Sequence, residues 1–258
     1  MINVRAVAIG CILLMTQSVT AQKLQLKTAT GHPMQYYVSL PDGWNASTKW
    51  PIVFVMEAAE KEYKLNAERF VSARGKMPFI LVAPIHTGNG NQGRRDPDLF
   101  PYDTKTWDYI DKVGDCTFND DGIRQIIQEV RRLYNGEEKI FVTGFEAGAH
   151  VVWSLVFNHP EYLKGVAIVA GNYRSRCVDE QAISKDPSRV SLPIRAFTGA
   201  KDETWGASSN LFVQWTTARD LAKKNGYTIV DEAIVPDKGH EPMPGEVMNC
   251  FHGLLKKN

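Results

Sequence analysis

Residues 139–156, KIFVTGFEAGAHVVWSLV, constrain the fold most, because they have the pattern of a buried strand, a glycine-bounded turn and a helix. The turn is Gly144-Phe145-Glu146-Ala147-Gly148. Gly144 permits a tight entry, and Gly148 lets the helix approach the sheet closely. We therefore expect Glu146 at the tip of the turn, over the strand end. There the amide of Ala147 and the helix dipole favour negative charge.

Strand patterns and helix patterns alternate along the rest of the chain. Runs of β-branched and aromatic residues predict strands at 35–40, 51–56, 79–83, 139–143, 165–170, 194–198 and 228–235. Apolar residues at helical spacing predict helices over 120–134, 151–156 and 211–222, the first capped by Asn119 or Asp120. The strands lack alternating polar positions. The pattern therefore predicts one α/β domain, residues 22–258, with a mostly parallel sheet covered on both faces and a site at the carboxyl ends of its strands.

Composition and the first residues indicate the setting in which the chain works. A formal net charge of +1 gives no reason to expect a nucleic acid or an anionic membrane as partner. Residues 1–21 have one cation at Arg5, an apolar run and Val19-Thr20-Ala21, which predicts a signal peptide and a secreted or periplasmic protein. The run is shorter than the ~20 residues of a membrane-spanning helix. Lipid attachment at Cys11 is a second, less favoured interpretation.

Three cysteines remain after residue 21, at positions 116, 177 and 250. An odd number leaves at least one thiol outside any disulfide within the chain. Cys116 and Cys177 lie in irregular stretches, and we expect a disulfide between them. Cys250 shares the helical phase of Val247 and Leu254, which predicts a buried thiol.

An acid and a histidine follow the turn in chain order. The strand at 194–198 runs into Thr198-Gly199-Ala200-Lys201-Asp202-Glu203, and the last strand ends before Asp237-Lys238-Gly239-His240. A glycine-bounded turn between a strand and a helix, called a nucleophile elbow, followed along the chain by an acid and a histidine is typical of α/β-hydrolases. Asp202 is the favoured acid, and the adjacent Glu203 is the alternative.

With these residues the chain resembles the α/β-hydrolase superfamily, in particular secreted esterases grouped with polyhydroxybutyrate depolymerases and feruloyl esterases. The resemblance covers about residues 35–258 and rests on KIFVTG, on AGAH after the turn, on TGAKDE and on the GH of DKGHEP. It implies Asp202 as the acid of a catalytic triad and His240 as the general base. The expected partner is a small-molecule or polymer ester, with no cofactor and no metal.

Two departures alter the usual chemistry of that family. Glu146 stands where the motif G-x-S-x-G has its serine, and the strand at 51–56 runs into Glu57-Ala58-Ala59-Glu60 instead of a His-Gly oxyanion loop. The carboxylates of Glu57 and Glu146 would repel the negative charge that develops on the carbonyl oxygen of an ester, unless one of them is protonated or turned away. We expect Glu57, Ala58 and Ala147 at the position where members of that family form the oxyanion hole. The loop tryptophans Trp107 and Trp205 are expected to line the pocket.

Four roles for Glu146 remain open. It can be a carboxylate nucleophile, or an acid or base that works with His240 on a bound water. It can join His150, Glu57, Glu60 and His240 around a divalent ion, although a local hydrogen bond is the simpler expectation for His150. It can also form an ion pair with His240 in a protein that binds without catalysing. The sequence thus predicts an esterase-like hydrolase with a rearranged site, and a catalytically inactive binding protein as the alternative.

Overall fold

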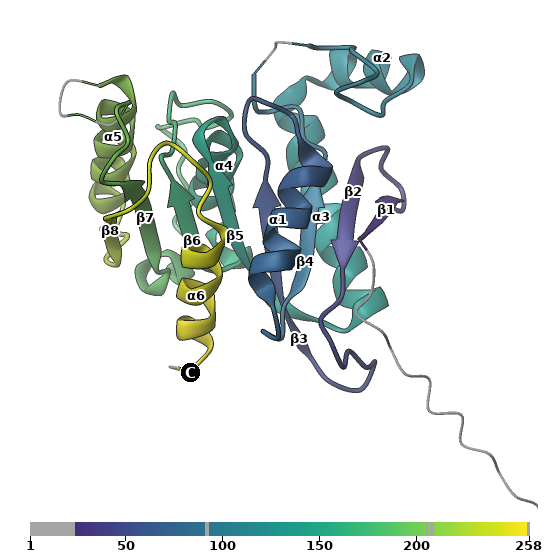
Figure 1. The fold of residues 1–258 in the computed structure, drawn as a ribbon. Coiled ribbons are helices and arrows are strands. Elements are labelled where there is room, and N and C mark those ends of the chain that lie inside the picture. The colour runs from purple at the N-terminus through teal and green to yellow at the C-terminus, as the bar shows by residue number, and fades with distance from the viewer. Residues whose placement is uncertain (1–23, 91–92, 205, 207–208, 257–258) are drawn as a thin grey trace, which may run out of the picture.

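A single sheet organises the molecule and brings the carboxyl ends of six strands to one edge. In the computed structural model, which describes residues 24–90, 93–204, 206 and 209–256, eight strands pair in the order β1-β2-β4-β3-β5-β6-β7-β8 (Figure 1). Neighbours from β4 to β8 are parallel, and β1 and β2 are antiparallel to their neighbours. The strands are β1 (Gln25–Thr28), β2 (Gln35–Ser39), β3 (Trp50–Met56), β4 (Ile80–Pro84), β5 (Gly136–Phe145), β6 (Leu163–Val169), β7 (Ile194–Gly199) and β8 (Val230–Val235).

Helices cover both faces of this sheet, as the sequence pattern predicts. They are α1 (Tyr63–Arg74), α2 (Thr104–Val113), α3 (Asp115–Tyr134), α4 (Ala149–Asn158), α5 (Asn210–Lys224) and α6 (Pro244–Leu255), with short 3-10 helices η1 (Glu146–Gly148), η2 (Pro160–Tyr162) and η3 (Pro187–Ser191). Strand β3 shows why two layers form. Its alternate residues Ile52 and Phe54 pack into the core with α3, α4 and α5, whereas Val53 and Val55 pack with α1 and α6 (Figure 1).

The seven expected strands are present, with ends that differ by a few residues. Strand β1 was not predicted, since its four residues are mostly exposed and carry no apolar run. Helix α2 was also missed, and it lies in residues 84–119, for which the sequence analysis predicted neither helix nor strand.

The expected cap of α3 at Asn119 or Asp120 is wrong. The helix begins at Asp115, and Asn119 is buried and accepts a hydrogen bond from the Thr87 amide through Oδ1 at 2.9 Å.

The expected disulfide between Cys116 and Cys177 is present, with a Cα–Cα distance of 5.2 Å. It ties the first turn of α3 to the loop that follows β6. Cys250 packs against the α1 and α6 side of the core but is only half-buried, whereas the sequence predicted a buried thiol. Within the described residues, no helix has the length and the apolar character needed to cross a membrane. The predicted signal peptide, residues 1–21, lies outside the described residues.

Candidate active site at the carboxyl edge of the sheet

The turn between β5 and α4 is a strained elbow with Glu146 at its tip. Glu146 has a φ of 45°, in the left-handed region that non-glycine residues rarely adopt. A Cβ on Gly144 would lie 2.8 Å from the backbone of Gly148, and a Cβ on Gly148 would lie 2.6 Å from the Met56 carbonyl oxygen. The two glycines therefore let the elbow close on itself and touch the loop after β3. This contact brings Ala147 and the Glu57–Glu60 loop together.

Asp202 and His240 meet at the ends of β7 and β8. Asp202 Oδ2 lies 2.9 Å from His240 Nδ1, within hydrogen-bonding distance. Thr204 joins both groups: its Oγ1 donates to Asp202 Oδ1 at 2.5 Å and lies 3.0 Å from His240 Nδ1. Burial raises the pKa of Asp202, but hydrogen bonds from Thr204 and His240 outweigh it and lower the pKa below its usual value. Asp202, and not the exposed Glu203, therefore orients the histidine.

Hydrogen bonds among buried polar residues hold the loop after β3 in place. The Glu57 amide donates to His86 Nε2 at 3.1 Å, so it is unavailable as an oxyanion donor. Burial and nearby cations lower the pKa of His86 to about 3, which keeps the ring neutral and able to accept this bond. Asn89 Nδ2 donates to the Ala58 carbonyl oxygen at 2.7 Å, and Tyr63 donates to the His86 carbonyl oxygen at 2.5 Å.

The carboxyl group of Glu57 does not share a cavity with Glu146. Glu57 is 5% exposed, and its Oε1 accepts a hydrogen bond from the Glu62 amide at the start of α1, at 3.1 Å. It lines a cavity of about 180 Å³ together with Ala58 and Phe145. Burial raises the pKa of Glu57 to about 7. The two anions that the sequence placed near one spot are thus separated, and one of them is readily protonated.

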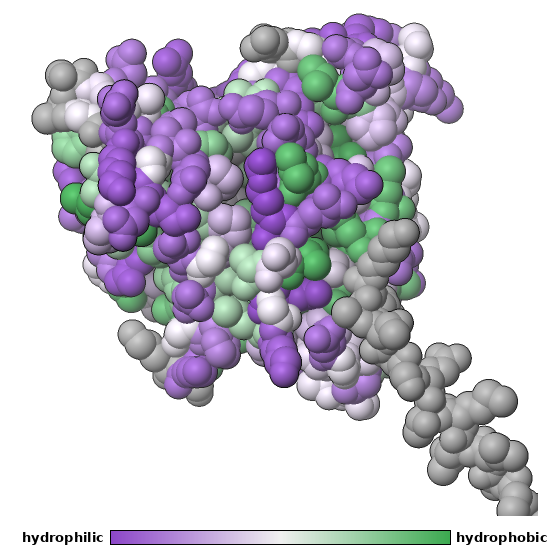
Figure 2. All heavy atoms as spheres, viewed as in Figure 1, coloured by the Kyte–Doolittle hydropathy of each residue, from purple (hydrophilic) through white to green (hydrophobic). Residues whose placement is uncertain are grey.

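Glu146 lines a second cavity of about 520 Å³ at the same edge of the sheet. The other lining residues are Ala59, Asn89, Gly90, Ala147, His150, Asn172, Arg174 and Arg176. Figure 2 shows the upper edge of the molecule hollowed between α5 and α2, with mostly hydrophilic residues on the visible rim. The Oε2 atom of Glu146 is buried and has no hydrogen-bond partner among the described residues. The lining of this cavity thus includes one acidic and two basic residues.

His240 approaches the elbow at the residue before Glu146. Its ring centroid lies 5.0 Å from that of Phe145, and its side chain is 30% exposed. Across the described residues we find no ion pair between Glu146 and His240, so the expected pair of the non-catalytic alternative is not formed. Nor do three His, Cys, Asp or Glu side chains of the described ranges converge as a metal site would require.

Some predicted residues take other positions. Trp107 is 3% exposed and packs edge-to-face on Phe100 at 5.3 Å, so the expectation that it lines the pocket beside Glu146 is wrong. Trp107 also packs edge-to-face on Tyr102 at 5.9 Å, so it belongs to the aromatic core. Trp205 lies outside the described residues. The local hydrogen bond expected for His150 is not formed at Nδ1, which is buried and has no partner in the described part of the chain.

Sequence reasoning missed the residues that complete the site. Thr204 follows the acid by two positions, and His86 and Asn89 follow β4 directly. Arg174 and Arg176 follow β6 and precede Cys177. The signal that could have found them is their place at the carboxyl ends of parallel strands, where a site in such a sheet is expected.

Comparisons with known proteins bear on the fold. No protein-family model matches the chain, and no curated protein is significantly similar to it in sequence. Its structure resembles poly(aspartic acid) hydrolase-1 from Sphingomonas sp. KT-1, with a TM-score of 0.60, 11% identity and coverage of 92% of this chain and 100% of that one. It also resembles the poly(3-hydroxybutyrate) depolymerase LpqC from Bordetella parapertussis, with a TM-score of 0.58, 13% identity and coverage of 91% and 90%.

A third similar structure is the Bacillus cereus carboxylesterase, with a TM-score of 0.56, 14% identity and coverage of 89% of this chain and 97% of that one. The chain thus has the α/β-hydrolase fold, as the sequence resemblance implied. At these identities the likeness defines the fold, and the chemistry has to be argued from this chain's own residues.

Proposed function

We propose that the protein is an extracytoplasmic ester hydrolase in which Glu146 activates a water molecule. The observation that carries this proposal is the histidine oriented by Asp202 at 2.9 Å, beside an elbow whose carboxylate borders a cavity. The elbow keeps the backbone strain that such turns use to present a reactive group, with a φ of 45° at Glu146. Hydrolysis of a carboxylic ester is the reaction that uses these groups most directly.

In the proposed reaction, the Glu146 carboxylate takes a proton from water while the water oxygen bonds to the ester carbonyl carbon. The tetrahedral species then breaks its bond to the alcohol oxygen. The proton on Glu146 passes through solvent to Nε2 of His240, whose Nδ1 is held by Asp202 and Thr204, and Nε2 gives it to the leaving alcohol oxygen. Both side chains then have their starting protonation states. The products are the free acid and the alcohol.

The negative charge on the carbonyl oxygen needs donors in this scheme. We assign this role to the backbone amides of Ala147 and Ala58, because the amide of Glu57 is bonded to His86. Gly148 has no Cβ to collide with the Met56 carbonyl oxygen, so these two segments can lie close together. Since the Glu57 carboxyl group bonds the start of α1 and has a raised pKa, it does not add a fixed anion there.

We also propose that residues 1–21 are a signal peptide and that residues 22–258 act outside the cytoplasm. The pattern of the leader supports this location, and so does the disulfide between Cys116 and Cys177, because disulfides persist in oxidising compartments.

The test is hydrolysis of p-nitrophenyl acetate and butyrate by the mature protein and by two variants. Glu146→Gln keeps the size of the side chain and removes its basicity, and Glu146→Ser restores the residue of the family motif. We expect activity in the native protein and a loss of about 10²–10⁴-fold in Glu146→Gln. Silence in the native protein with activity in Glu146→Ser would refute the proposal and indicate an elbow that binds without catalysing.

A further inference from the structure

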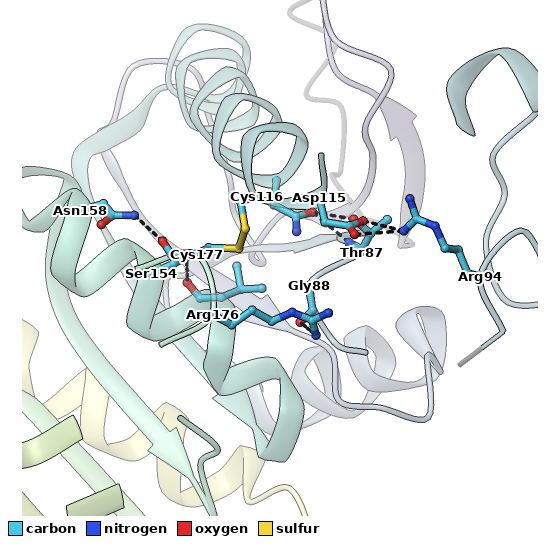
Figure 3. The surroundings of a disulfide bond; sticks show 11 residues. Thr87, Gly88, Arg94, Asp115, Cys116, Ser154, Asn158, Arg176 and Cys177 are labelled. Atoms are coloured by element: carbon cyan, nitrogen blue, oxygen red, sulfur yellow. Dashed lines mark hydrogen bonds and ion pairs between the residues drawn. A yellow bond between two sulfur atoms is a disulfide. The ribbon is translucent and has the colours of Figure 1, made fainter. Parts of the chain in front are cut away.

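A disulfide ties one wall of the cavity beside Glu146 to the start of α3. The wall includes Arg174 and Arg176, and the residue that follows them, Cys177, is bonded to Cys116 in the first turn of α3 (Figure 3). Glu146, the carboxylate of the proposed reaction, lines the same cavity. The covalent bond therefore acts on the chain directly beside the site.

Residues 174–177 gain little support from the hydrophobic core. Their sequence is Arg-Ser-Arg-Cys, the first two residues are exposed, and the last two are half-buried. The preceding residue differs, because Tyr173 is 3% exposed and packs edge-to-face on Phe157 at 5.8 Å. Apolar packing thus fixes the loop as far as Tyr173, and other contacts have to fix residues 174–177.

The backbone of this segment is strained. Ser175 has a φ of 50° and Cys177 a φ of 58°, both in the left-handed region that non-glycine residues rarely adopt. Such conformations cost free energy and persist where the surrounding structure holds them in place. Residues 174–177 therefore depend on contacts with neighbouring elements.

A covalent bond and hydrogen bonds supply those contacts. The disulfide joins Cys177 to Cys116, and the Cys177 carbonyl oxygen accepts a hydrogen bond from Asn158 Nδ2 of α4 at 2.9 Å (Figure 3). Arg176 donates through Nη1 to the carbonyl oxygen of Gly88 at 2.9 Å. Figure 3 shows Arg176 extending from the disulfide towards Gly88. Hydrogen bonds exchange readily with water, so the disulfide is the stronger restraint.

The first turns of α3 hold both partners of this last hydrogen bond. Asn119, three residues after Cys116, accepts from the Thr87 amide through Oδ1 at 2.9 Å, and Gly88 follows Thr87 directly. Gly88 is therefore held on α3 whether or not the disulfide is formed. In contrast, Arg176 is held there through the disulfide, which decides whether it stays opposite Gly88.

The disulfide is also accessible to small thiols. Cys116 is exposed and Cys177 is half-buried, and exposed disulfides are reduced more readily than buried ones. Cys250 lies in α6, on the other face of the sheet from α3. Reduction of the disulfide can therefore be separated from any reaction at Cys250.

We infer that the bond between Cys116 and Cys177 is a redox-sensitive switch that completes the cavity beside Glu146. With both cysteines reduced, residues 174–177 leave their position against Gly88 and the cavity loses a fixed wall. Forming the disulfide fixes the wall, so the chain reaches full activity only in an oxidising compartment. The change in activity rests on the proposed function, whereas the release of residues 174–177 does not.

Reduction proceeds by thiol–disulfide exchange, with a low-molecular-weight thiol as the reductant. Its thiolate attacks one sulfur of the disulfide, the S–S bond breaks, and the other cysteine leaves as a thiolate that takes a proton. A second molecule of the thiol attacks the mixed disulfide and releases the remaining cysteine. The protein gains two electrons and two protons, and the two reductant molecules are joined as a disulfide.

Hydrogen exchange followed by mass spectrometry tests the release of the wall without any substrate. The mature protein is compared before and after reduction with glutathione, and with the double variant Cys116→Ser, Cys177→Ser. We expect exchange of residues 174–177 to become about tenfold faster or more in both, with exchange of β5 unchanged. A disulfide that glutathione does not reduce, unchanged exchange in residues 174–177, or faster exchange of β5 as well would each overturn the inference.

Hydrolysis of p-nitrophenyl butyrate tests the effect on the site. We expect reduction to lower kcat/KM about tenfold, mainly through KM because the released wall has to be ordered again on binding, and oxidised glutathione to restore it. Cys250→Ser is the control and should respond as the native protein does, whereas the double variant should not respond to either form of glutathione.

The two measurements separate this inference from the proposed function. If reduction releases residues 174–177 but the oxidised protein hydrolyses no ester, the release is supported and the proposed function fails. If the oxidised protein is active and complete reduction leaves kcat and KM unchanged, the switch is refuted and the proposed function stands.

Discussion

Replacing Glu57 by Gln should make the protein more stable at neutral and alkaline pH. Glu57 is 5% exposed, and its pKa in the folded protein is raised from 4.5 to about 7 by burial, with the nearby Glu60 and Glu62 acting in the same direction. Below pH 4.5 the carboxyl group is neutral in both the folded and the unfolded chain. As the pH rises towards 7, the unfolded chain ionises freely while the folded one holds its proton, so stability falls.

The size of this effect follows from the pKa change. Each pKa unit corresponds to about 1.4 kcal/mol, so the rise from 4.5 to about 7 amounts to about 3 kcal/mol above pH 7. Gln lacks this penalty and keeps an oxygen that can accept from the Glu62 amide. The free energy of unfolding of Glu57→Gln minus that of the native protein should therefore increase by about 3 kcal/mol between pH 4.5 and pH 8.

Urea unfolding followed by circular dichroism at pH 4.5, 6, 7 and 8 measures this difference. Taking the difference cancels the contributions of His86 and His150, whose lowered pKa values also make stability depend on pH. Glu138→Gln is the control, because the Glu138 side chain is 78% exposed and should change stability by no more than about 0.5 kcal/mol at any pH. A difference between Glu57→Gln and the native protein that does not vary with pH would refute the reasoning.

Three further predictions concern the elbow, the histidine and the disulfide. Gly148→Ala should destabilise the protein by about 1–3 kcal/mol in urea unfolding, because its Cβ would lie 2.6 Å from the Met56 carbonyl oxygen. Gly253→Ala is the control, because Gly253 is an exposed residue of α6 and a Cβ there would meet no atom within 4 Å; it should stabilise the protein by about 0.5–1 kcal/mol. If both substitutions changed the free energy of unfolding by the same amount, the close approach at Gly148 would be contradicted. Asp202→Asn should lower kcat about 100-fold or more on p-nitrophenyl butyrate, and Thr204→Val about tenfold, with KM little changed; a change in KM alone would argue against their role in orienting His240. Replacing Cys116 and Cys177 together by Ser should lower the free energy of unfolding by about 4 kcal/mol in urea unfolding, given their separation of 61 residues, and an unchanged free energy of unfolding would contradict a stabilising disulfide.

The parts of the fold that depend on local pattern could be predicted from the sequence. The elbow is one of them, since two glycines spaced around Glu146 between a β-branched run and a helix have few other structural solutions. The order of the acid and the histidine was also informative, because parallel strands bring their carboxyl ends to one edge. Strand β1 was missed because its four residues are mostly exposed and carry no apolar run. Helix α2 does carry a local signal, with Asp103 as its N-cap and Trp107 and Ile110 on its buried face, and that signal was overlooked.

The residues that tune the site depend on contacts between distant segments, and so they were not predictable. His86 accepts from the amide of Glu57, 29 positions earlier, and nothing near either residue signals this bond. Thr204 was unremarkable until the structure placed it between Asp202 and His240. Arg174 and Arg176 line the cavity beside Glu146, and their loop is bonded to α3 by the disulfide and to α4 by Asn158, contacts that a linear pattern does not reveal. Trp107 seemed a pocket residue because its helix was not recognised.

The most direct test of the central claim is the ratio of kcat/KM between the native protein and Glu146→Gln on p-nitrophenyl butyrate at pH 7.5. If Glu146 activates the attacking water, the ratio should be about 100 or more, with both proteins equally folded by circular dichroism. Equal values of kcat/KM would contradict a catalytic carboxylate at the elbow.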